Sequence, residues 1–289
     1  MGAVTLDPKP ARCHPGVVKT VMKKIVDANY LQRPELHDYL TDSPDNYVVF
    51  TDFAFMEAHK GNALINISRS LEIVFDFPEQ VMVLKDTRDV MALDFSSAHL
   101  PEHLVDDNRT VGFTEFCRQV QLAREGDATM SEEITRRGQW VSDYFEERRT
   151  RHDAIVDGIK GFIKSFEPSH LKALRTYQPL PPDMIEKAKK DVVLLSAFLF
   201  RDSPAATHRA LSNGLRNHYI FRHTLSVYLL CLRWIADGGV DHLPPEKLGN
   251  DFVDMTYVSY ATYFDGLLSG DKKMNELYGD TMWFLNHVF

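Results

Sequence analysis

The stretch "PDNYVVFTDFAF", residues 44–55, decides the fold. Its middle, residues 47–50, is a run of aromatic and β-branched residues, and the residues before it are typical of a turn. A short run that is apolar on both faces is typical of a strand in the middle of a parallel sheet. The sequence therefore predicts an α/β fold, with a buried strand that ends just before Asp52.

A second apolar run, Val81 to Leu84, follows the helical pattern of residues 53–77. The order strand, helix, strand predicts a parallel βαβ unit. Residues 16–40 precede this unit. Their first half predicts an amphipathic helix, and their second half is long enough for a shorter helix. The apolar positions that recur at helical spacing in that first half are Val17, Val18, Val21, Met22, Ile25 and Val26.

The middle of the chain has a different character, because it contains long charged helical patterns and no predicted strand. We interpret it as a large helical insertion in the α/β core. The predicted organisation is an N-terminal helical arm (1–44), the first part of the core (45–90), the insertion (91–215) and the second part of the core (216–289).

Composition restricts the class of protein. The formal net charge of −8 argues against a protein that coats nucleic acid by bulk electrostatic attraction. Three widely spaced cysteines predict neither a disulfide framework nor a zinc site. No apolar run approaches the roughly 20 residues that a membrane helix needs, and the first residues do not resemble a signal peptide. We therefore expect a cytoplasmic protein without membrane contact.

The stretch "NDFVDMTYVSYATYFDGLLSGDKKM", residues 250–274, places four aspartates in an otherwise apolar segment. Asn250 is a candidate helix N-cap, with Asp251 and Asp254 in the first turn. Asp265 lies in a turn and is interpreted as structural. The short run "LLS" predicts a further strand, and Asp271 follows it.

These positions are predicted to converge. A helix that leads into the next strand of a parallel sheet starts at the carboxyl edge of the sheet, where α/β proteins place their sites. Asp52 and Asp271 leave strands at this edge, and Asp251 and Asp254 open a helix there. Clustered carboxylates repel one another unless a cation neutralises them, and oxygen ligands suit Mg²⁺ or Mn²⁺.

The strand ending in Asp52, the late helix "NDFVD" and the strand ending "SGD" resemble the order and spacing of parts in PIN-domain ribonucleases. The resemblance covers residues 45–90 and 215–289 and implies a three-layer α/β/α fold. It implies Mg²⁺ or Mn²⁺ held by Asp52, Asp251, Asp254 and Asp271, and hydrolysis of single-stranded RNA by a metal-activated water. The implied catalytic residues are Asp52, Asp254, Asp271 and, as the family's glutamate, Glu57.

Two alternatives stay open at this point. The first is a PIN-like scaffold without activity, which uses the helical insertion to bind protein partners or a second copy of the chain. The second is another phosphohydrolase on a doubly wound sheet. Haloacid-dehalogenase-like enzymes, however, need a second aspartate two residues after the first, and this chain has Ala54 at that position.

Overall fold

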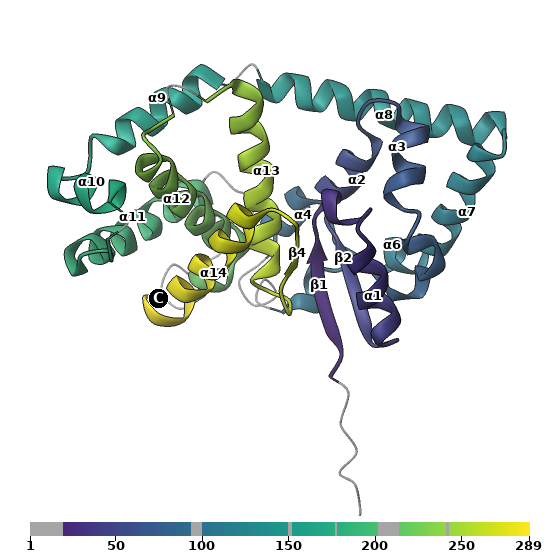
Figure 1. Cartoon of the computed structure of the whole chain (residues 1–289), viewed down its shortest axis with the longest axis horizontal. Coiled ribbons are helices and arrows are strands. Elements are labelled where there is room, and N and C mark those ends of the chain that lie inside the picture. The colour runs from purple at the N-terminus through teal and green to yellow at the C-terminus, as the bar shows by residue number, and fades with distance from the viewer. Residues whose placement is uncertain (1–19, 94–99, 150–151, 177, 202–213, 241–242) are drawn as a thin grey trace, which may run out of the picture.

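The structure is a computed structural model that describes residues 20–93, 100–149, 152–176, 178–201, 214–240 and 243–289. At its centre lies a four-stranded parallel sheet in the order β3-β2-β1-β4 (Figure 1). The strands are β1 (Met22–Val26), β2 (Asn46–Phe50), β3 (Val81–Val83) and β4 (Leu267–Leu268). The predicted α/β class with a parallel sheet is confirmed, as are the strands expected at β2, β3 and β4.

The helix predicted at the start of the chain is wrong where the structure describes it. Residues Met22–Val26 form β1, which pairs with β2 on one side and with β4 on the other. Spacings of three and four fit a helix, but Ile25 and Val26 are adjacent and both fully buried, as in a central strand. The predicted N-terminal helical arm (1–44) therefore contributes an inner strand of the sheet. Residues 1–19 lie outside the described part.

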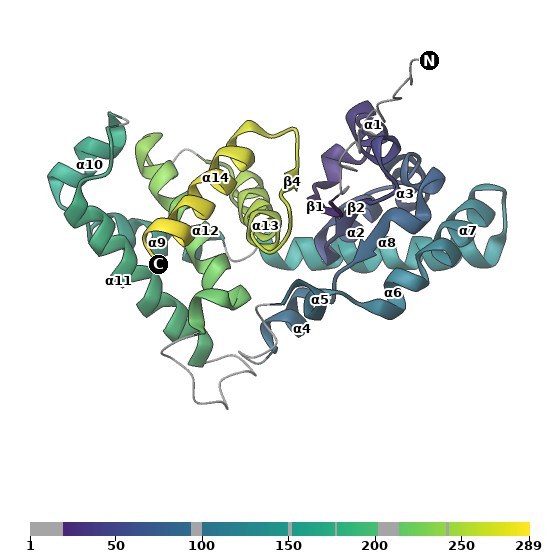
Figure 2. The ribbon, with the colours of Figure 1, turned by 90° about the horizontal axis from the view of Figure 1, so that it is seen from below.

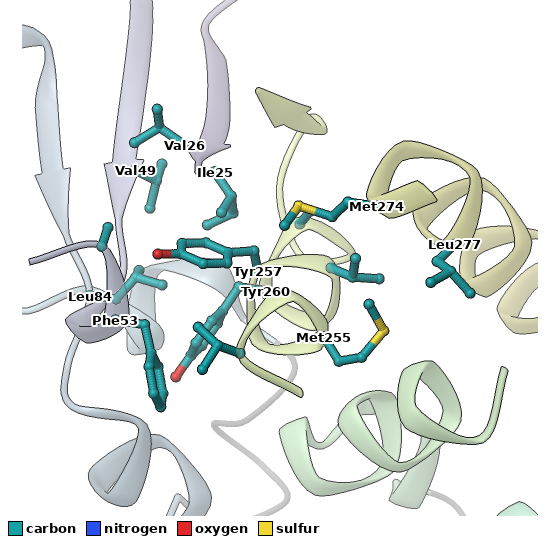
Figure 3. Close-up of a cluster of buried hydrophobic side chains, with 14 of the residues drawn as sticks. Ile25, Val26, Val49, Phe53, Leu84, Met255, Tyr257, Tyr260, Met274 and Leu277 are labelled. Carbon is teal, nitrogen blue, oxygen red and sulfur yellow. The ribbon is translucent and has the colours of Figure 1, made fainter. Parts of the chain in front are cut away.

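Helices cover both faces of the sheet. Ile25 and Val49 are partners in the β1–β2 register, and Figure 3 shows them beside Tyr257 and Tyr260 of helix α13 (Pro245–Ala261). The next residue of β2, Phe50, points to the opposite face because side chains alternate along a strand. Its ring lies 5.7 Å from that of Phe113, at the start of helix α7.

Helices dominate the rest of the molecule. Their bounds are α1 (Pro34–Asp42), α2 (Asp52–His59), α3 (Ala63–Ser70), α4 (Thr87–Met91), α5 (Pro101–Leu104), α6 (Asp107–Val111), α7 (Phe113–Arg124), α8 (Ala128–Arg149), α9 (His152–Ile163), α10 (Pro168–Arg175), α11 (Pro182–Arg201), α12 (Tyr219–Ala236), α13 and α14 (Lys272–His287). Between residues 91 and 215, the described segments contain helices and a single isolated bridge, from Leu84 to Val105, but no strand. Among the described residues, no helix is long and apolar enough to cross a membrane.

The segment predicted as an insertion shares the core of the sheet. Phe113 of α7 is 1% exposed and packs on β2, and helix α8 contacts α2, α3 and α13. Figures 1 and 2 show α8 passing from the helices beside β2 to those around α13. Helices α10 and α11 pack on α12. Buried residues from both sides of the predicted boundaries belong to one hydrophobic cluster.

Helix α13 runs from the carboxyl edge of the sheet to its amino edge. After α13 ends, the backbone N–H of Asp265 donates to the carbonyl of Lys23, and the Asp265 carboxylate accepts from the Lys23 N–H at 2.7 Å. The chain then enters β4. The structural role predicted for Asp265 is therefore a bond to the first residues of β1. This direction of α13 places its N-terminal half above the carboxyl ends of β1 and β4.

Candidate functional site

Asp27 follows β1 at the carboxyl edge of the sheet. The parallel register joins Val26 to Leu268, so Asp27 lies beside the residue that follows β4. Its Oδ2 accepts from the Ser269 hydroxyl at 2.9 Å, and its Oδ1 accepts from the Asn29 N–H at 3.3 Å. The residue is 3% exposed, and this burial raises the pKa of its carboxyl. The charge of Asp271 raises this pKa further.

Glu57 reaches the same edge from α2. The phenol of Tyr257, on α13, donates to Glu57 Oε2 at 2.5 Å. Burial raises the pKa of Glu57 to about 7; the Tyr257 hydrogen bond opposes the rise, and the negative charge of Asp27 adds to it. Glu57 is therefore an inward-facing carboxyl group within electrostatic range of Asp27.

Asp254 lies on α13, three residues before Tyr257 and so on the same face of the helix. Burial raises the pKa of its carboxyl to about 8. The charges of Asp251, Asp27 and Glu57 add to the increase, whereas Lys273 opposes it. Within the described residues, no hydrogen bond or ion pair reaches this carboxylate. Asp254 is thus the least compensated acid of the group.

Asp271 lies at the exposed side of the same edge. It caps helix α14, because its Oδ1 accepts from the Met274 N–H at 3.0 Å. Its own N–H donates to the hydroxyl of Ser269, which in turn donates to Asp27. The predicted position of Asp271, just after a strand at the carboxyl edge, is confirmed. Asp271 is also within electrostatic range of Asp27.

Asp251, predicted as a metal ligand, is committed to other groups. Its Oδ2 accepts from the indole N–H of Trp234 at 3.0 Å, and its Oδ1 forms an ion pair with Lys273. A second lysine, Lys247, lies 3.7 Å from the same oxygen. The structure also starts α13 at Pro245, so Asp251 and Asp254 lie inside the helix and not in its first turn. Gly249 lies inside this helix, and because glycine disfavours a helix interior, the sequence predicts a later start.

Asp52, predicted as the first acid of the cluster, makes a different set of contacts. Its two carboxylate oxygens accept from the backbone N–H and the hydroxyl of Thr87, each at 2.8 Å. The Tyr260 phenol donates to the same hydroxyl at 3.1 Å. The charged neighbours resolved for Asp52 are Asp86 and Arg109, and none of its contacts reaches the other predicted site acids. Asp52 therefore ties the start of α2, which follows β2, to the start of α4, which follows β3.

The structure therefore revises the set of acids that sequence reasoning brings together. Asp254, Asp271 and Glu57 lie within electrostatic range of Asp27, a residue that the sequence analysis missed. Asp52 and Asp251 instead bond to structural partners. The missed signal is "IVDAN", residues 25–29: two apolar β-branched residues, an aspartate and turn-forming residues. The same pattern identified β2 and Asp52. Because residues 17–26 were assigned to a helix, the strand pattern that ends at Asp27 was not recognised.

Lys273 and Lys272 differ sharply in their surroundings. Lys273 is 21% exposed in its side chain and pairs with Asp251, whereas Lys272 is 90% exposed and lies 3.6 Å from Glu276. Lys272, which follows Asp271 directly in the chain, is thus a solvated surface residue. We call Asp27, Glu57, Asp254 and Asp271 the acidic group. Lys273 is its internal cation, since it lowers the pKa of Asp254 and pairs with the neighbouring Asp251.

Removing the Lys273 charge should destabilise the protein. We expect Lys273→Met to lower the free energy of unfolding by about 3 kcal/mol at pH 7, because Asp251 would keep a buried charge with weaker compensation. The neighbouring Lys272→Met should change it by less than about 0.5 kcal/mol. Urea unfolding of both variants measures the difference. Equal effects would contradict the assignment of Lys273 as the internal cation.

The donors suit a hard divalent cation in their chemistry, because they are carboxyl oxygens whose charges act on one another at the carboxyl edge. Their arrangement, however, does not form a metal site. Across the ranges that the structure describes, no three His, Cys, Asp or Glu side chains form a group that could hold a metal ion. The site is therefore a set of neighbouring carboxylates with Lys273 among them, and not a closed coordination shell.

Comparisons with models of protein families, with curated proteins and with solved structures found no match for this chain.

Proposed function

We propose that the protein is a metal-dependent phosphodiester hydrolase acting on single-stranded RNA. The observation that carries this proposal is the electrostatic coupling of Asp27, Glu57 and Asp254 near the carboxyl edge of a parallel sheet, with Asp271 at its exposed side. Three of these carboxyl groups have a raised pKa, first through burial and then through one another's charges. Groups of this kind are common where a protein performs chemistry.

The resemblance to PIN-domain ribonucleases supports the proposal in a revised form. It requires a strand that ends in an aspartate, and β1 with Asp27 meets this requirement as β2 with Asp52 does. The proposed set retains Glu57, Asp254 and the Asp271 of the "SGD" segment, although Asp254 lies inside α13 and not in its first turn. Asp27 takes the place of Asp52 in the proposed set.

The residues that would supply oxygen ligands to Mg²⁺ or Mn²⁺ are Asp27, Asp254 and Asp271. Because the described residues form no ready-made metal group, an ion would have to draw these carboxylates closer together. Such an ion would lower the pKa of a bound water and stabilise negative charge on the phosphoryl oxygens. Glu57 has a pKa of about 7, so its carboxyl group can accept or release a proton near neutral pH. Tyr257 holds this group in place by donating to Oε2. Ser269 orients the Asp27 carboxylate.

The experiment is cleavage of a 5′-labelled single-stranded RNA by the purified chain with Mn²⁺ and, separately, with EDTA. We expect cleavage only with Mn²⁺, and at least a hundredfold loss in the double variant Asp254→Asn, Asp271→Asn. The control is Asp265→Asn, at the opposite edge of the sheet, which should cleave normally. Equal cleavage by all forms would indicate a contaminating nuclease. Turnover of p-nitrophenyl phosphate without RNA cleavage would favour the other phosphohydrolase class.

A second candidate function, a binding module without catalysis, is supported by a different observation. Helix α11 exposes an apolar stripe of Val193, Leu194, Leu195, Phe198 and Leu199. The charge of Lys273 also lowers the pKa of Asp254 without a metal ion. A chain that neither cleaves RNA nor gains stability with Mn²⁺ would fit this second function.

A further inference from the structure

Arg33 lies at the rim of the acidic group, in the segment between β1 and α1. Its backbone N–H donates to the Tyr30 carbonyl at 3.0 Å, and its guanidinium carbon lies 5.8 Å from the centre of the Tyr30 ring. The Arg33 charge lowers the pKa of Asp27, against the larger effect of burial. Its cationic group is thus within electrostatic range of the innermost aspartate.

The Arg33 guanidinium lies directly over Gly270, in the segment between β4 and α14. A Cβ atom built on Gly270 would come within 2.0 Å of a guanidinium nitrogen and 2.2 Å of the guanidinium carbon. Any other residue at position 270 would therefore push the guanidinium away. Gly270 itself lies between Ser269, which bonds Asp27, and Asp271. The absence of a side chain at this position lets Arg33 span the two loops that carry Asp27 and Asp271.

The Arg33 guanidinium also forms no direct ion pair within the described part of the chain. Other exposed arginines form ion pairs, for example Arg109 with Asp86 at 2.6 Å and Arg118 with Glu115 at 2.6 Å. Among the described residues, no carboxylate lies within 4.0 Å of the Arg33 guanidinium, although its charge acts on Asp27. In a chain with a net charge of −8, this is a cation held beside the site and left open to solvent.

We propose that Arg33 is a positioning residue that binds a phosphate of the RNA backbone and directs the neighbouring phosphodiester toward Asp27 and Asp271. This inference rests on the proposed function. A planar guanidinium donates two parallel hydrogen bonds to phosphate oxygens, which fixes orientation as well as position. Gly270 and Tyr30 hold the guanidinium in advance, so less side-chain freedom is lost on binding. The local positive charge also offsets the repulsion between an acidic protein and an anionic substrate.

Lys272 is the competing cation, because it follows Asp271 directly in the chain. It is 90% exposed and lies near Glu276, and a lysine presents a mobile point charge without a fixed direction. In the part of the chain that the structure describes, no contact links Lys272 to the buried acids. Arg33 is therefore the residue at this rim whose position is set by the fold.

The test is single-turnover cleavage of labelled single-stranded RNA in Mn²⁺ at several KCl concentrations. It yields the protein concentration at half-maximal rate (K1/2) and the plateau rate. We expect Arg33→Gln to raise K1/2 about tenfold with little change in the plateau. The slope of log K1/2 against log salt should fall by about 0.7, the value for one lost phosphate contact on a single strand. Arg33→Lys should recover part of K1/2.

Gly270→Ala is the second variant, and it leaves Arg33 in the chain while displacing its guanidinium. Because the displaced atoms are the end of a flexible side chain, the fold should persist, and K1/2 should rise about threefold to tenfold. Arg118→Gln, on α7, is the matched control and should behave as the wild type. Unchanged K1/2 and salt slope in Arg33→Gln, with a cleaving wild type, would overturn the role of Arg33 alone. A wild type that does not cleave would overturn the proposed function as well.

Discussion

Asp254→Asn is expected to stabilise the folded protein by about 2 to 4 kcal/mol at pH 9. Burial, together with the charges of Asp251, Asp27 and Glu57, raises the pKa of the Asp254 carboxyl to about 8. In the unfolded chain this pKa returns to about 3.9, so the folded state binds an extra proton between these two values. The free energy of unfolding of the wild type therefore falls as the pH rises from about 4 to 8. Asparagine carries no charge and removes this loss.

Urea unfolding at several pH values between 5 and 9 measures the effect. The two stabilities should be closest near pH 5 and farthest apart above pH 8. Asp251→Asn is a matched control on the same helix and should have the opposite sign, because Lys273 would lose its buried partner. A destabilised Asp254→Asn, or a gap that does not grow with pH, would show that the Asp254 carboxylate is not crowded by other acids.

Mn²⁺ is expected to raise the stability of the wild type by about 2.7 kcal/mol when its concentration is 100 times its dissociation constant. The physical reason is that a divalent cation relieves the repulsion among Asp27, Asp254, Glu57 and Asp271. Asp27→Asn should abolish most of this gain, since it removes the innermost carboxylate. The substitution keeps the shape of the side chain, so the amide oxygen can still accept from the Asn29 N–H.

Asp52→Asn is the decisive comparison for this second prediction. An asparagine at position 52 can still accept the hydrogen bond from the Thr87 N–H. Among the residues that the structure describes, Asp52 has no contact with Asp27, Glu57, Asp254 or Asp271, so the variant should respond to Mn²⁺ like the wild type. Thermal unfolding over a series of Mn²⁺ and Mg²⁺ concentrations records both responses. Loss of the gain in Asp52→Asn with retention in Asp27→Asn would favour the interpretation drawn from the sequence alone.

The fold could be predicted from the sequence where the pattern had one interpretation. The run around Val48 and Val49 is too short and too β-branched for a helix and follows clear turn residues, so β2 was identified correctly. The run from Met22 to Val26 fits both a helix and a strand, because its apolar positions have spacings of one, three and four. Its pairing with β4, about 240 residues later in the chain, decides the matter and is not visible locally.

The candidate site shows the same limit. Asp271 was placed correctly because a minimal strand and a turn surround it in the sequence. Asp251 and Asp254 look equivalent there, and it is the contacts with Trp234, Lys273 and Lys247 that make Asp251 a structural residue. The hydrogen bond from Tyr257 to Glu57 joins residues 200 positions apart, so nothing near Glu57 in the sequence indicates its burial. Tertiary partners decide which acids remain uncompensated.

The central claim is that Asp27, and not Asp52, joins Glu57 and Asp254 in one electrostatic group. The most direct measurement is an NMR titration of the protein labelled with ¹³C at the side-chain carboxyl carbons of Glu and Asp, for the wild type, Asp27→Asn and Asp52→Asn. We predict pKa values of about 7 for Glu57 and about 8 for Asp254 in the wild type and in Asp52→Asn, and lower values for both groups in Asp27→Asn. Titration of both groups near pH 4 in the wild type, or a decrease caused by Asp52→Asn and not by Asp27→Asn, would contradict the claim.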